Sequence, residues 1–465
     1  MPKEQRGRQN LNLTTGTQAS PSISCTEHKG DRNHRGSLSN RWVRIGLAAQ
    51  NEQLVFSNLM THVNEETLKE AFKALEGTKA LGVDGISKMQ YGRNLEVNLK
   101  ALAERVQRGT YRPQPRREIH IPKANGKTRP IAIACFEDKL VDWVVGKVLT
   151  QVYEPLFIRN SFGYRPNKSA DGAIKACYYS LCKNTRKFVV EIDFSSFFNT
   201  IPHRKLMRVI GKRIADRRFK GLIGRFLKGN LITPLGDNLP SKIGTPQGSI
   251  MSPILANIYL NEVIDQWFLE NYASYNNVIV RYADDAVFFF RKEDDVKSFN
   301  KCLEQRVEKF GLKLNKDKTK TTVMDKALHE QFNFLGFPFY WGKQGSRRIL
   351  KIKTQKDKLI KSMREFEAWI KKARNQLKLN KLWALARAKI TGHINYFGYW
   401  MNGQKLNHFY YSAIKSLYKW LNRRSQKRSY SWEGFSERLG NFPLIKPWNK
   451  LKLKPLGWSP YVIYH

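Results

Sequence analysis

Two adjacent carboxylates, Asp284 and Asp285, interrupt a run of β-branched and aromatic residues in the segment VIVRYADDAVFFF, residues 278–290. Val, Ile, Tyr and Phe suit the half-buried surface of a sheet, so the flanks predict two strands joined by a tight turn. A third carboxylate, Asp193, ends another apolar strand pattern that begins at Phe188. Buried acids are costly unless a cation neutralises them, so the convergence of all three would indicate a metal site.

The residues alone leave two interpretations of the Asp-Asp turn open. In the first, it is a solvated turn whose side chains bond their own backbone. In the second, three carboxylates bind two Mg²⁺ ions about 3.5–4 Å apart, with Mn²⁺ as a substitute. One ion would lower the pKa of a 3′-hydroxyl and the other would neutralise a pyrophosphate leaving group. The chemistry of the second interpretation is nucleotidyl transfer.

The segments that must position these acids predict an α+β fold. A helix start is predicted at Asn64, with Glu66 and Thr67 in the first turn. Strands and helices then alternate irregularly to about residue 340, which predicts a mixed sheet with helices on one side. The strand-like segments are REIHIP, RPIAIA, KFVVEID, VIVRY and AVFFF. After about residue 350, basic amphipathic segments predict a helical bundle.

The charge of the chain predicts a polyanionic partner. Its 465 residues contain 82 Lys and Arg against 39 Asp and Glu, a formal net charge of +43. Residues 341–465 hold 28 of the basic and 5 of the acidic residues, so about a quarter of the chain carries more than half of the charge. A generally basic surface would spread the charge evenly. A dedicated nucleic-acid surface in this region is therefore the better interpretation.

Five cysteines without a CxxC pair predict free thiols in an intracellular protein, which we place in a bacterial cytoplasm rather than an organelle. No apolar run approaches the ~18 residues of a membrane span, so no membrane partner is expected. Residues 1–50 are rich in Ser, Thr, Asn, Gly and Arg and predict a flexible basic arm. Residues 441–465 predict a basic tail.

Several blocks, in order, resemble the reverse transcriptases encoded by group II introns and, more loosely, the retroviral enzymes. The blocks are EIDFSSFF around Asp193, GTPQGSIMSPILANIYLNEVID at 244–265 and YADD at 282–285. The likeness extends roughly from Leu54 to Leu439. It implies an RNA-directed DNA polymerase that uses an RNA template, a DNA primer and deoxynucleoside triphosphates. Group II intron RNA and a DNA target are implied as further partners.

The resemblance also implies an architecture. It predicts a right-hand polymerase with fingers and palm over residues 51–340 and an all-α thumb with a maturase-specific region over 341–440. The fullest members of the family carry a C-terminal endonuclease with paired cysteines and histidines. No such cluster follows here, so we do not expect this chain to cut the second DNA strand. The oligomeric state, one chain or a homodimer, stays open.

Site residues carry over one by one. Asp193, Asp284 and Asp285 match the catalytic, metal-binding acids of the family. Asp285 is expected to bind metal least directly, since neighbours on a strand point apart. Phe198 matches an aromatic side chain that packs under the sugar of the incoming nucleotide, where a ring excludes a 2′-hydroxyl. Taken alone, Phe198 would be expected to pack in the core.

Further nucleotide contacts are implied at Lys127, Arg129, Gln247 and Lys318. The first two flank an Asn-Gly hairpin, a design that places cations over a triphosphate. Gln247 lies in GTPQG, which the resemblance places at the nucleotide or template, and Lys318 in LNKDKTK matches a basic residue near the phosphates. NFLGFPFY, around Gly336, matches the hairpin that grips the primer.

The segment at residues 392–428 resembles the thumb and maturase region, and its cations alternate with aromatic rings. The expected RNA contacts are Lys405, Lys415, Lys419, Arg423 and Arg424. Two alternatives to an intron-encoded enzyme remain. One is a free-standing cellular reverse transcriptase in phage defence or DNA repair, and the other is a splicing cofactor that binds RNA without polymerising.

Overall fold

The computed structural model describes residues 32–122, 126, 128–182, 185–273, 276–424, 430–441 and 444. The chain divides into two compact units, Met1–Arg41 and Trp42–His465. Only the second unit is described below, apart from one helix that continues into it. The part of the predicted arm before residue 32 and almost all of the predicted tail lie outside the described residues. No helix in the described part is long and apolar enough to cross a membrane.

Helix α1 (Arg32–Ala49) corrects the prediction of an irregular arm over residues 1–50. Trp42 and Ile45 are buried one turn apart, and Trp42 Nε1 donates a hydrogen bond to Glu70 Oε2 at 2.9 Å. The apolar residues of this helix are few and separated by charges, so they produce no clear periodicity in the sequence. Tertiary packing, rather than the local pattern, identifies the helix.

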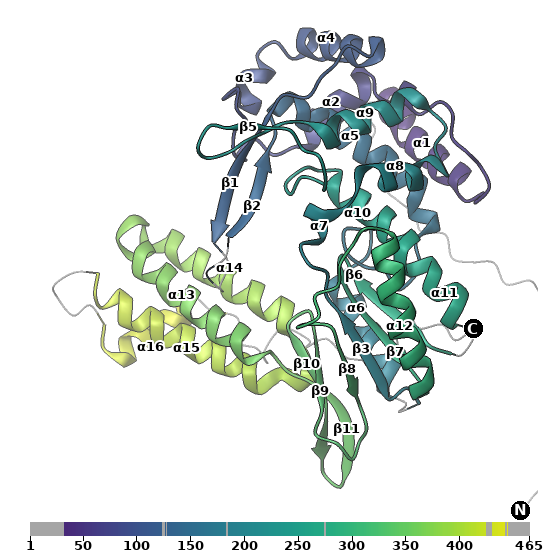
Figure 1. Cartoon of the computed structure of the whole chain (residues 1–465). Helices are drawn as coiled ribbons and strands as arrows, with labels where there is room; N and C mark the ends of the chain where they lie inside the picture. The colour runs from purple at the N-terminus through teal and green to yellow at the C-terminus, as the bar shows by residue number, and fades with distance from the viewer. Residues whose placement is uncertain are drawn as a thin grey trace, which may run out of the picture. The chain divides into compact units, whose positions relative to one another are not determined.

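The first third of the described chain is mostly helical around a long hairpin (Figure 1). Its elements are η1 (Met60–His62), α2 (Glu65–Ala74), α3 (Lys88–Gly92), α4 (Leu95–Arg108), β1 (Arg116–Pro122), β2 (Thr128–Ile133), α5 (Phe136–Tyr153), η2 (Glu154–Leu156) and α6 (Ala170–Cys182). The predicted start of α2 is confirmed, because Asn64 and Thr67 form a capping box. Strands β1 and β2 are both predicted and pair antiparallel.

The middle third contains the central sheet. Its elements are β3 (Phe188–Ile192), α7 (Phe197–Thr200), α8 (His203–Gly211), α9 (Arg217–Lys228), β4 (Leu231–Ile232), β5 (Asn238–Leu239), α10 (Ser252–Leu260), the π-helical η3 (Asn261–Asp265), α11 (Gln266–Tyr272), β6 (Val278–Tyr282), β7 (Asp285–Phe290), α12 (Glu293–Lys309) and β8 (Lys320–Val323). The central sheet has the order β6-β7-β3-β8 and is antiparallel throughout. Strands β4 and β5 instead extend the hairpin sheet, in the order β2-β1-β4-β5.

Three separate sheets replace the single mixed sheet that the sequence predicts, and helices cover both faces of the central one. Val190 and Ile192 of β3 belong to the core cluster that contains Phe299 of α12. Val189, on the opposite face of the same strand, packs with Ala173 of α6. A strand that is buried on both faces reads as an unbroken apolar run, so the sequence does not reveal the second helical layer.

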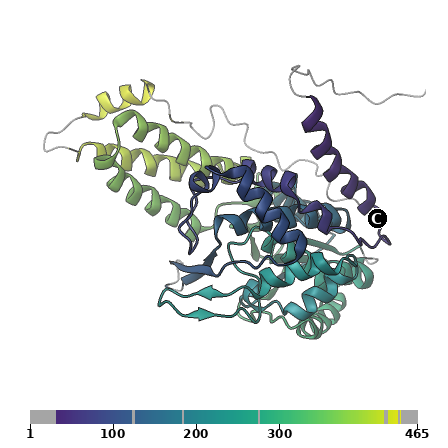
Figure 2. The ribbon, with the colours of Figure 1, turned by 90° about the horizontal axis from the view of Figure 1, so that it is seen from above.

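The last third joins a small sheet to a helical bundle. Its elements are β9 (Gln331–Phe334), β10 (Phe337–Gln344), β11 (Arg347–Ile352), α13 (Lys356–Gln376), α14 (Leu379–Phe397), η5 (Trp400–Asn402), α15 (Gly403–Leu421) and α16 (Trp432–Asn441). The predicted domain boundary at residue 340 falls within β10, and the helices begin after β11, as the basic amphipathic segments after about residue 350 predict. Helices α13, α14 and α15 lie side by side (Figures 1 and 2) and share one apolar core.

A buried ion pair holds the turn between β6 and β7. The side chain of Arg281 is fully buried and donates hydrogen bonds to both carboxylate oxygens of Asp265, at 2.8 and 2.5 Å. It also donates to Asn257 Oδ1 at 2.9 Å and to the carbonyl oxygen of Ala283 at 2.8 Å. Ala283 has a φ of 57°, and a Cβ atom added to Gly163 would lie 2.4 Å from its nitrogen. Arg281 and Gly163 therefore fix the backbone directly before Asp284 and Asp285.

We expect Arg281→Met to lower the free energy of unfolding by about 3–5 kcal/mol, because it leaves the Asp265 carboxylate buried without a partner. Adding Asp265→Leu removes both charges, so the double variant should regain most of the lost stability. Urea unfolding of the two variants and the wild type measures both effects. A single variant as stable as the wild type would show that the ion pair does not hold this turn.

Candidate active site

The three predicted carboxylates converge at one end of the central sheet. Asp193 directly follows β3, while Asp284 and Asp285 stand at the turn between β6 and β7. The antiparallel register of β3 and β7 runs as far as Ile192 and Ala286, so Asp193 and Asp285 occupy the next facing positions. Both line one cavity of about 190 Å³. The solvated-turn interpretation does not predict this convergence.

Burial, and to a lesser degree the neighbouring carboxylates, raise the pKa of Asp284 and Asp285. Burial raises the pKa of Asp284, the charge of Asp193 raises it further, and Arg129 and Arg281 act in the opposite direction. The surrounding protein desolvates Asp285 although part of its side chain stays exposed. Together with the charges of Asp284 and Asp193, this desolvation raises the pKa of Asp285 to about 6. Acids that raise one another's pKa gain from a nearby cation.

The donor set fits a hard divalent cation, although the protein does not form a complete cage for it. In the described part of the chain, no three His, Cys, Asp or Glu side chains are arranged to hold a metal ion by themselves. Mg²⁺ keeps several waters and shares phosphate oxygens, so a partial carboxylate set suits it. Facing positions point to the same side of a sheet, which places Asp285 beside Asp193. The prediction that Asp285 binds metal least directly stays a prediction, because facing positions do not by themselves fix the ligands of a metal.

Asp193 already contacts a cation of the protein itself. Lys318 Nζ donates to Asp193 Oδ2 at 3.0 Å, and its predicted place near the phosphates stays a prediction. Asn315 Nδ2 donates to the same oxygen at 3.1 Å, and the Asn315 N–H donates to the Asp193 carbonyl oxygen at 2.7 Å. The sequence analysis misses Asn315, although it stands three residues before Lys318 in the same motif.

The hairpin predicted around Gly336 lies beside the acids. Its two turn residues, Leu335 and Gly336, have φ values of 51° and 86°, as a tight β-hairpin turn requires. Leu335 lines the cavity that contains the carboxylates. Tyr396 Oη, from α14, donates to the carbonyl oxygen of Leu335 at 2.9 Å. The turn therefore connects the cavity with the helical bundle.

Phe198 and Gln247 lie on two segments that pack against each other. The ring of Phe198 is partly buried and meets Phe197 edge-on, with ring centroids 5.4 Å apart. The carbonyl oxygen of Phe198 accepts a hydrogen bond from the Thr245 N–H at 2.7 Å. Gln247 Nε2 donates to Asn199 Oδ1 at 3.4 Å. The GTPQG loop is thereby held against the segment that follows Asp193.

The end of this loop is held by a buried acid that the sequence analysis does not identify. Asp142 of α5 accepts hydrogen bonds from Ser249 Oγ, from the Ile250 N–H and from the Met251 N–H, at 3.0, 2.7 and 3.1 Å. Burial raises the pKa of Asp142, and these donors partly offset that effect. An acid within the apolar face of a predicted helix is the signal that could have revealed it.

The β1–β2 hairpin brings Arg129 within electrostatic range of the acids. Arg129 pairs with Ile121 across the hairpin, and its charge lowers the pKa of Asp284. Lys127 lies outside the described residues, so its predicted role stays a prediction. Tyr164 is a further neighbour that the sequence analysis misses. Burial raises the pKa of Tyr164, and the Asp284 carboxylate contributes to this shift.

The five cations predicted to contact RNA belong to one helix and its end. They are Lys405, Lys415 and Lys419 in α15, and Arg423 and Arg424 directly after it. Lys415 and Lys419 are exposed and line a pocket of about 360 Å³ with Tyr411. These two cations and an exposed ring thus share one open surface.

Some of these cations also have partners within the protein. Lys419 Nζ lies 2.8 Å from Glu367 Oε1, and Arg423 stacks over the Trp420 ring at 5.5 Å. Arg424 Nη2 donates to a backbone carbonyl oxygen of the loop before α14 at 3.1 Å. The ion pair is exposed and therefore weak, so it leaves Lys419 able to exchange Glu367 for a phosphate.

Comparison with known proteins identifies a family that matches the part of the chain in which the three acids lie. The reverse transcriptase (RNA-dependent DNA polymerase) family matches residues 121–339. Protein YkfC of Escherichia coli strain K12 is 33% identical over 327 residues, which cover 62% of this chain and 84% of YkfC. The group II intron-encoded protein LtrA of Lactococcus lactis subsp. cremoris is 35% identical over 201 residues, or 43% of this chain. The match spans only a third of LtrA's own length, 33%.

Among solved structures, the telomerase from Candida albicans in complex with the TWJ fragment of telomeric RNA is distantly similar. It is 14% identical, with a TM-score of 0.40, and the match covers 72% of this chain and 64% of that chain. The residues matched by the family include all three acids as well as Phe198 and Gln247. The elements of the structure confirm the α+β fold with C-terminal helices, and the family match together with the similarity to YkfC shows that the chain belongs to the reverse transcriptases, which are RNA-dependent DNA polymerases.

Proposed function

We propose that this reverse transcriptase is encoded by a group II intron, copies RNA into DNA, and binds its intron RNA to assist splicing and mobility. The observation that carries the intron assignment is the 35% identity to LtrA, a protein named as group II intron-encoded. The charge distribution supports it, since residues 341–465 hold 28 basic and 5 acidic residues. Such a surface suits a structured RNA.

In the polymerase reaction, Asp193, Asp284 and Asp285 hold the divalent cations. Bound Mg²⁺, or Mn²⁺ in its place, supplies activation of the primer 3′-hydroxyl and neutralisation of the pyrophosphate. Lys318 contacts the same carboxylate side of the site and offers its charge to the phosphates of the incoming deoxynucleoside triphosphate. Arg129 does so from the hairpin. The partly buried ring of Phe198 packs under the sugar and excludes a 2′-hydroxyl.

The presence or absence of a group II intron in the DNA that flanks the coding sequence distinguishes this proposal from its alternatives. A group II intron RNA transcribed from that DNA should splice faster in vitro when the protein is present. Primer extension without any flanking intron would instead favour a free-standing enzyme of phage defence or repair. Faster splicing without primer extension would favour the splicing cofactor.

The first test concerns the acids. We expect Asp284→Asn to reduce primer extension on an RNA template at least about 100-fold, because the variant loses electrostatic stabilisation of the transition state. RNA affinity should stay nearly unchanged, since no docking contact is lost. Asp317→Asn is a matched control, because Asp317 is an exposed acid in the Lys318 loop. Extension by the Asp284 variant at close to the wild-type rate would refute the metal assignment.

The second test concerns the sugar. Replacing Phe198 by Val opens space beside the nucleotide, so incorporation of ribonucleotides should rise about tenfold or more relative to deoxynucleotides. The neighbouring Phe197 is buried in the core, so Phe197→Leu is the control and should lower stability without changing this ratio. A competition assay with both nucleotide types measures it. An unchanged ratio in the Phe198 variant would show that this ring packs in the core and does not select the sugar.

The third test separates RNA binding from polymerisation. Changing Lys415, Lys419, Arg423 and Arg424 together to Gln should weaken intron RNA binding and flatten its salt dependence, because fewer counterions are released. Extension of a pre-annealed primer and template at saturating concentration should largely persist. Four exposed lysines in and after α12 provide a control of equal charge. They are Lys297, Lys301, Lys309 and Lys313.

The third test measures two quantities: the affinity for intron RNA at several salt concentrations, and the rate of primer extension. If the α15 variant and the α12 control lose the same affinity, binding depends on total charge and not on this surface. Proportional loss of RNA binding and extension would show that one surface serves both activities.

A further inference from the structure

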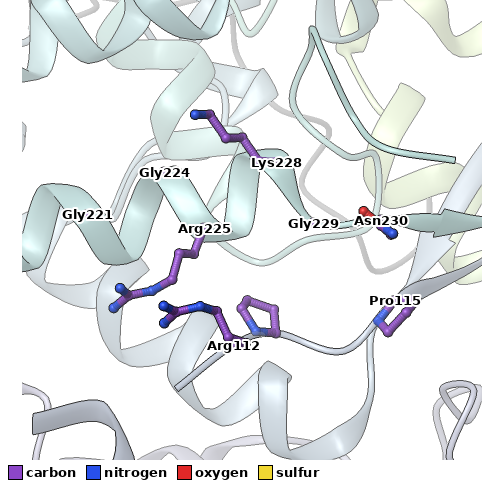
Figure 3. A pocket seen from close by; sticks show the side chains of 9 residues that line it. Arg112, Pro115, Gly221, Gly224, Arg225, Lys228, Gly229 and Asn230 are labelled. Carbon is purple, nitrogen blue, oxygen red and sulfur yellow. The ribbon is translucent and has the colours of Figure 1, made fainter. Parts of the chain in front are cut away.

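A basic pocket of about 560 Å³ lies at the base of the β1–β2 hairpin (Figure 3). One wall is the segment between α4 and β1, and the other is the C-terminal half of α9. Figure 3 shows Arg112 and Arg225 extending toward each other, while Lys228 points away from them. Of the nine described residues that line the pocket, none is acidic. The pocket therefore concentrates positive charge.

The two guanidinium groups carry an electrostatic cost that an anion would remove. Burial lowers the pKa of Arg225, and the charge of Arg112 lowers it further. Nε of Arg225 is buried and has no hydrogen-bond partner. Arg112 Nη1 is held by the carbonyl oxygens of Gly109 and Tyr111, at 2.9 and 3.0 Å. Two arginines oriented in this way, with a buried donor unused, form the arrangement that binds a phosphate through a planar fork.

The backbone of α9 leaves room for such a ligand. Gly221 and Gly224 line the pocket, and a Cβ atom added at either position would meet nothing within 4 Å. The ligand can therefore approach the helix closely. Pro113 and Pro115 make the opposite wall rigid, since proline restricts its own backbone.

A second pocket, of about 400 Å³, adjoins the basic pocket. The two share Gly229, and the lining of the second also includes Asn199 and Gln247. Leu231 and Leu239 contribute apolar surface to this second pocket, whose charged lining residues are Arg116, Glu118 and Lys242. At about 3.3 Å per residue, strand β1 spans roughly 20 Å from the basic pocket toward the tip of the hairpin. Apolar walls suit bases and paired arginines suit phosphates, so the two pockets together match a single strand.

We propose that the basic pocket binds a backbone phosphate of the RNA template strand that has not yet been copied. Arg112 and Arg225 hold this phosphate, and the second pocket lies beneath the bases between it and Gln247. The proposal rests on the polymerase function and adds an anchor outside the active site. Free phosphate or a triphosphate presents the same chemistry, so the experiment must separate these sources from RNA.

The test compares two template–primer duplexes, one with a long single-stranded template overhang and one with blunt ends. Arg225→Gln should weaken the affinity for the overhang duplex about tenfold, as expected for one charge-assisted contact. The slope of log affinity against log salt should become shallower by about 0.7. The affinity for the blunt duplex should not change. Arg208→Gln is the matched control, because Arg208 is exposed in the last turn of α8 and does not line the pocket.

Thermal unfolding provides a second, independent measurement. Without RNA, Arg225→Gln should melt at the wild-type temperature or above it, because one of two facing charges is removed. Inorganic phosphate should raise the melting temperature of the wild type more than that of the variant. Arg225→Lys keeps the charge but lacks the planar fork, so it should restore the salt slope without restoring full affinity.

Unchanged overhang affinity in the variant would overturn the proposal, and phosphate stabilisation in that case would assign the pocket to a small anion. Equal loss with both duplexes would also overturn it, because the contact would then be to the duplex. Failure of the proposed polymerase function would give a result distinct from failure of this template contact. In that case the wild-type protein would not extend primers at all, whatever the overhang affinity of the Arg225 variant.

Discussion

The active site depends on one buried ion pair, between Arg281 of β6 and Asp265 at the end of η3. Removing one partner of such a pair leaves an unpaired charge in the core, so the two residues are held together strongly. The pair fixes the carbonyl oxygen of Ala283, and the glycine at 163 leaves space for that turn. Asp265 is the last residue of the π-helical segment η3, a local widening of the helix of the kind often found at functional sites. The two carboxylates of this turn, Asp284 and Asp285, thus take their position from the buried side chain of Arg281.

Local patterns predicted most of what positions the acids. The five strands named from the sequence all form, because runs of Val, Ile and Phe bounded by turn residues are unambiguous over short lengths. The Asn64 cap and the two-residue turn at Ala283 and Asp284 are local as well. The resemblance assigned Lys318 to the phosphates and Gln247 to the nucleotide or template; in the structure Lys318 contacts Asp193 and Gln247 contacts Asn199.

The remaining features depend on contacts between distant parts of the chain. Asp142 binds a loop more than a hundred residues later, so no spacing rule reveals it. Asn315 looks like an ordinary turn residue until its side chain reaches Asp193. The second helical layer was missed for a different reason. An apolar run shows that a segment is buried, but not which elements bury it.

The hydrogen bond from Tyr396 to the carbonyl oxygen of Leu335 joins a helix of the bundle to a turn that lines the carboxylate cavity. A shift of α14 along its axis would therefore be transmitted to the backbone of Leu335. The position of the helical bundle and the shape of the carboxylate cavity are mechanically coupled through one tyrosine side chain.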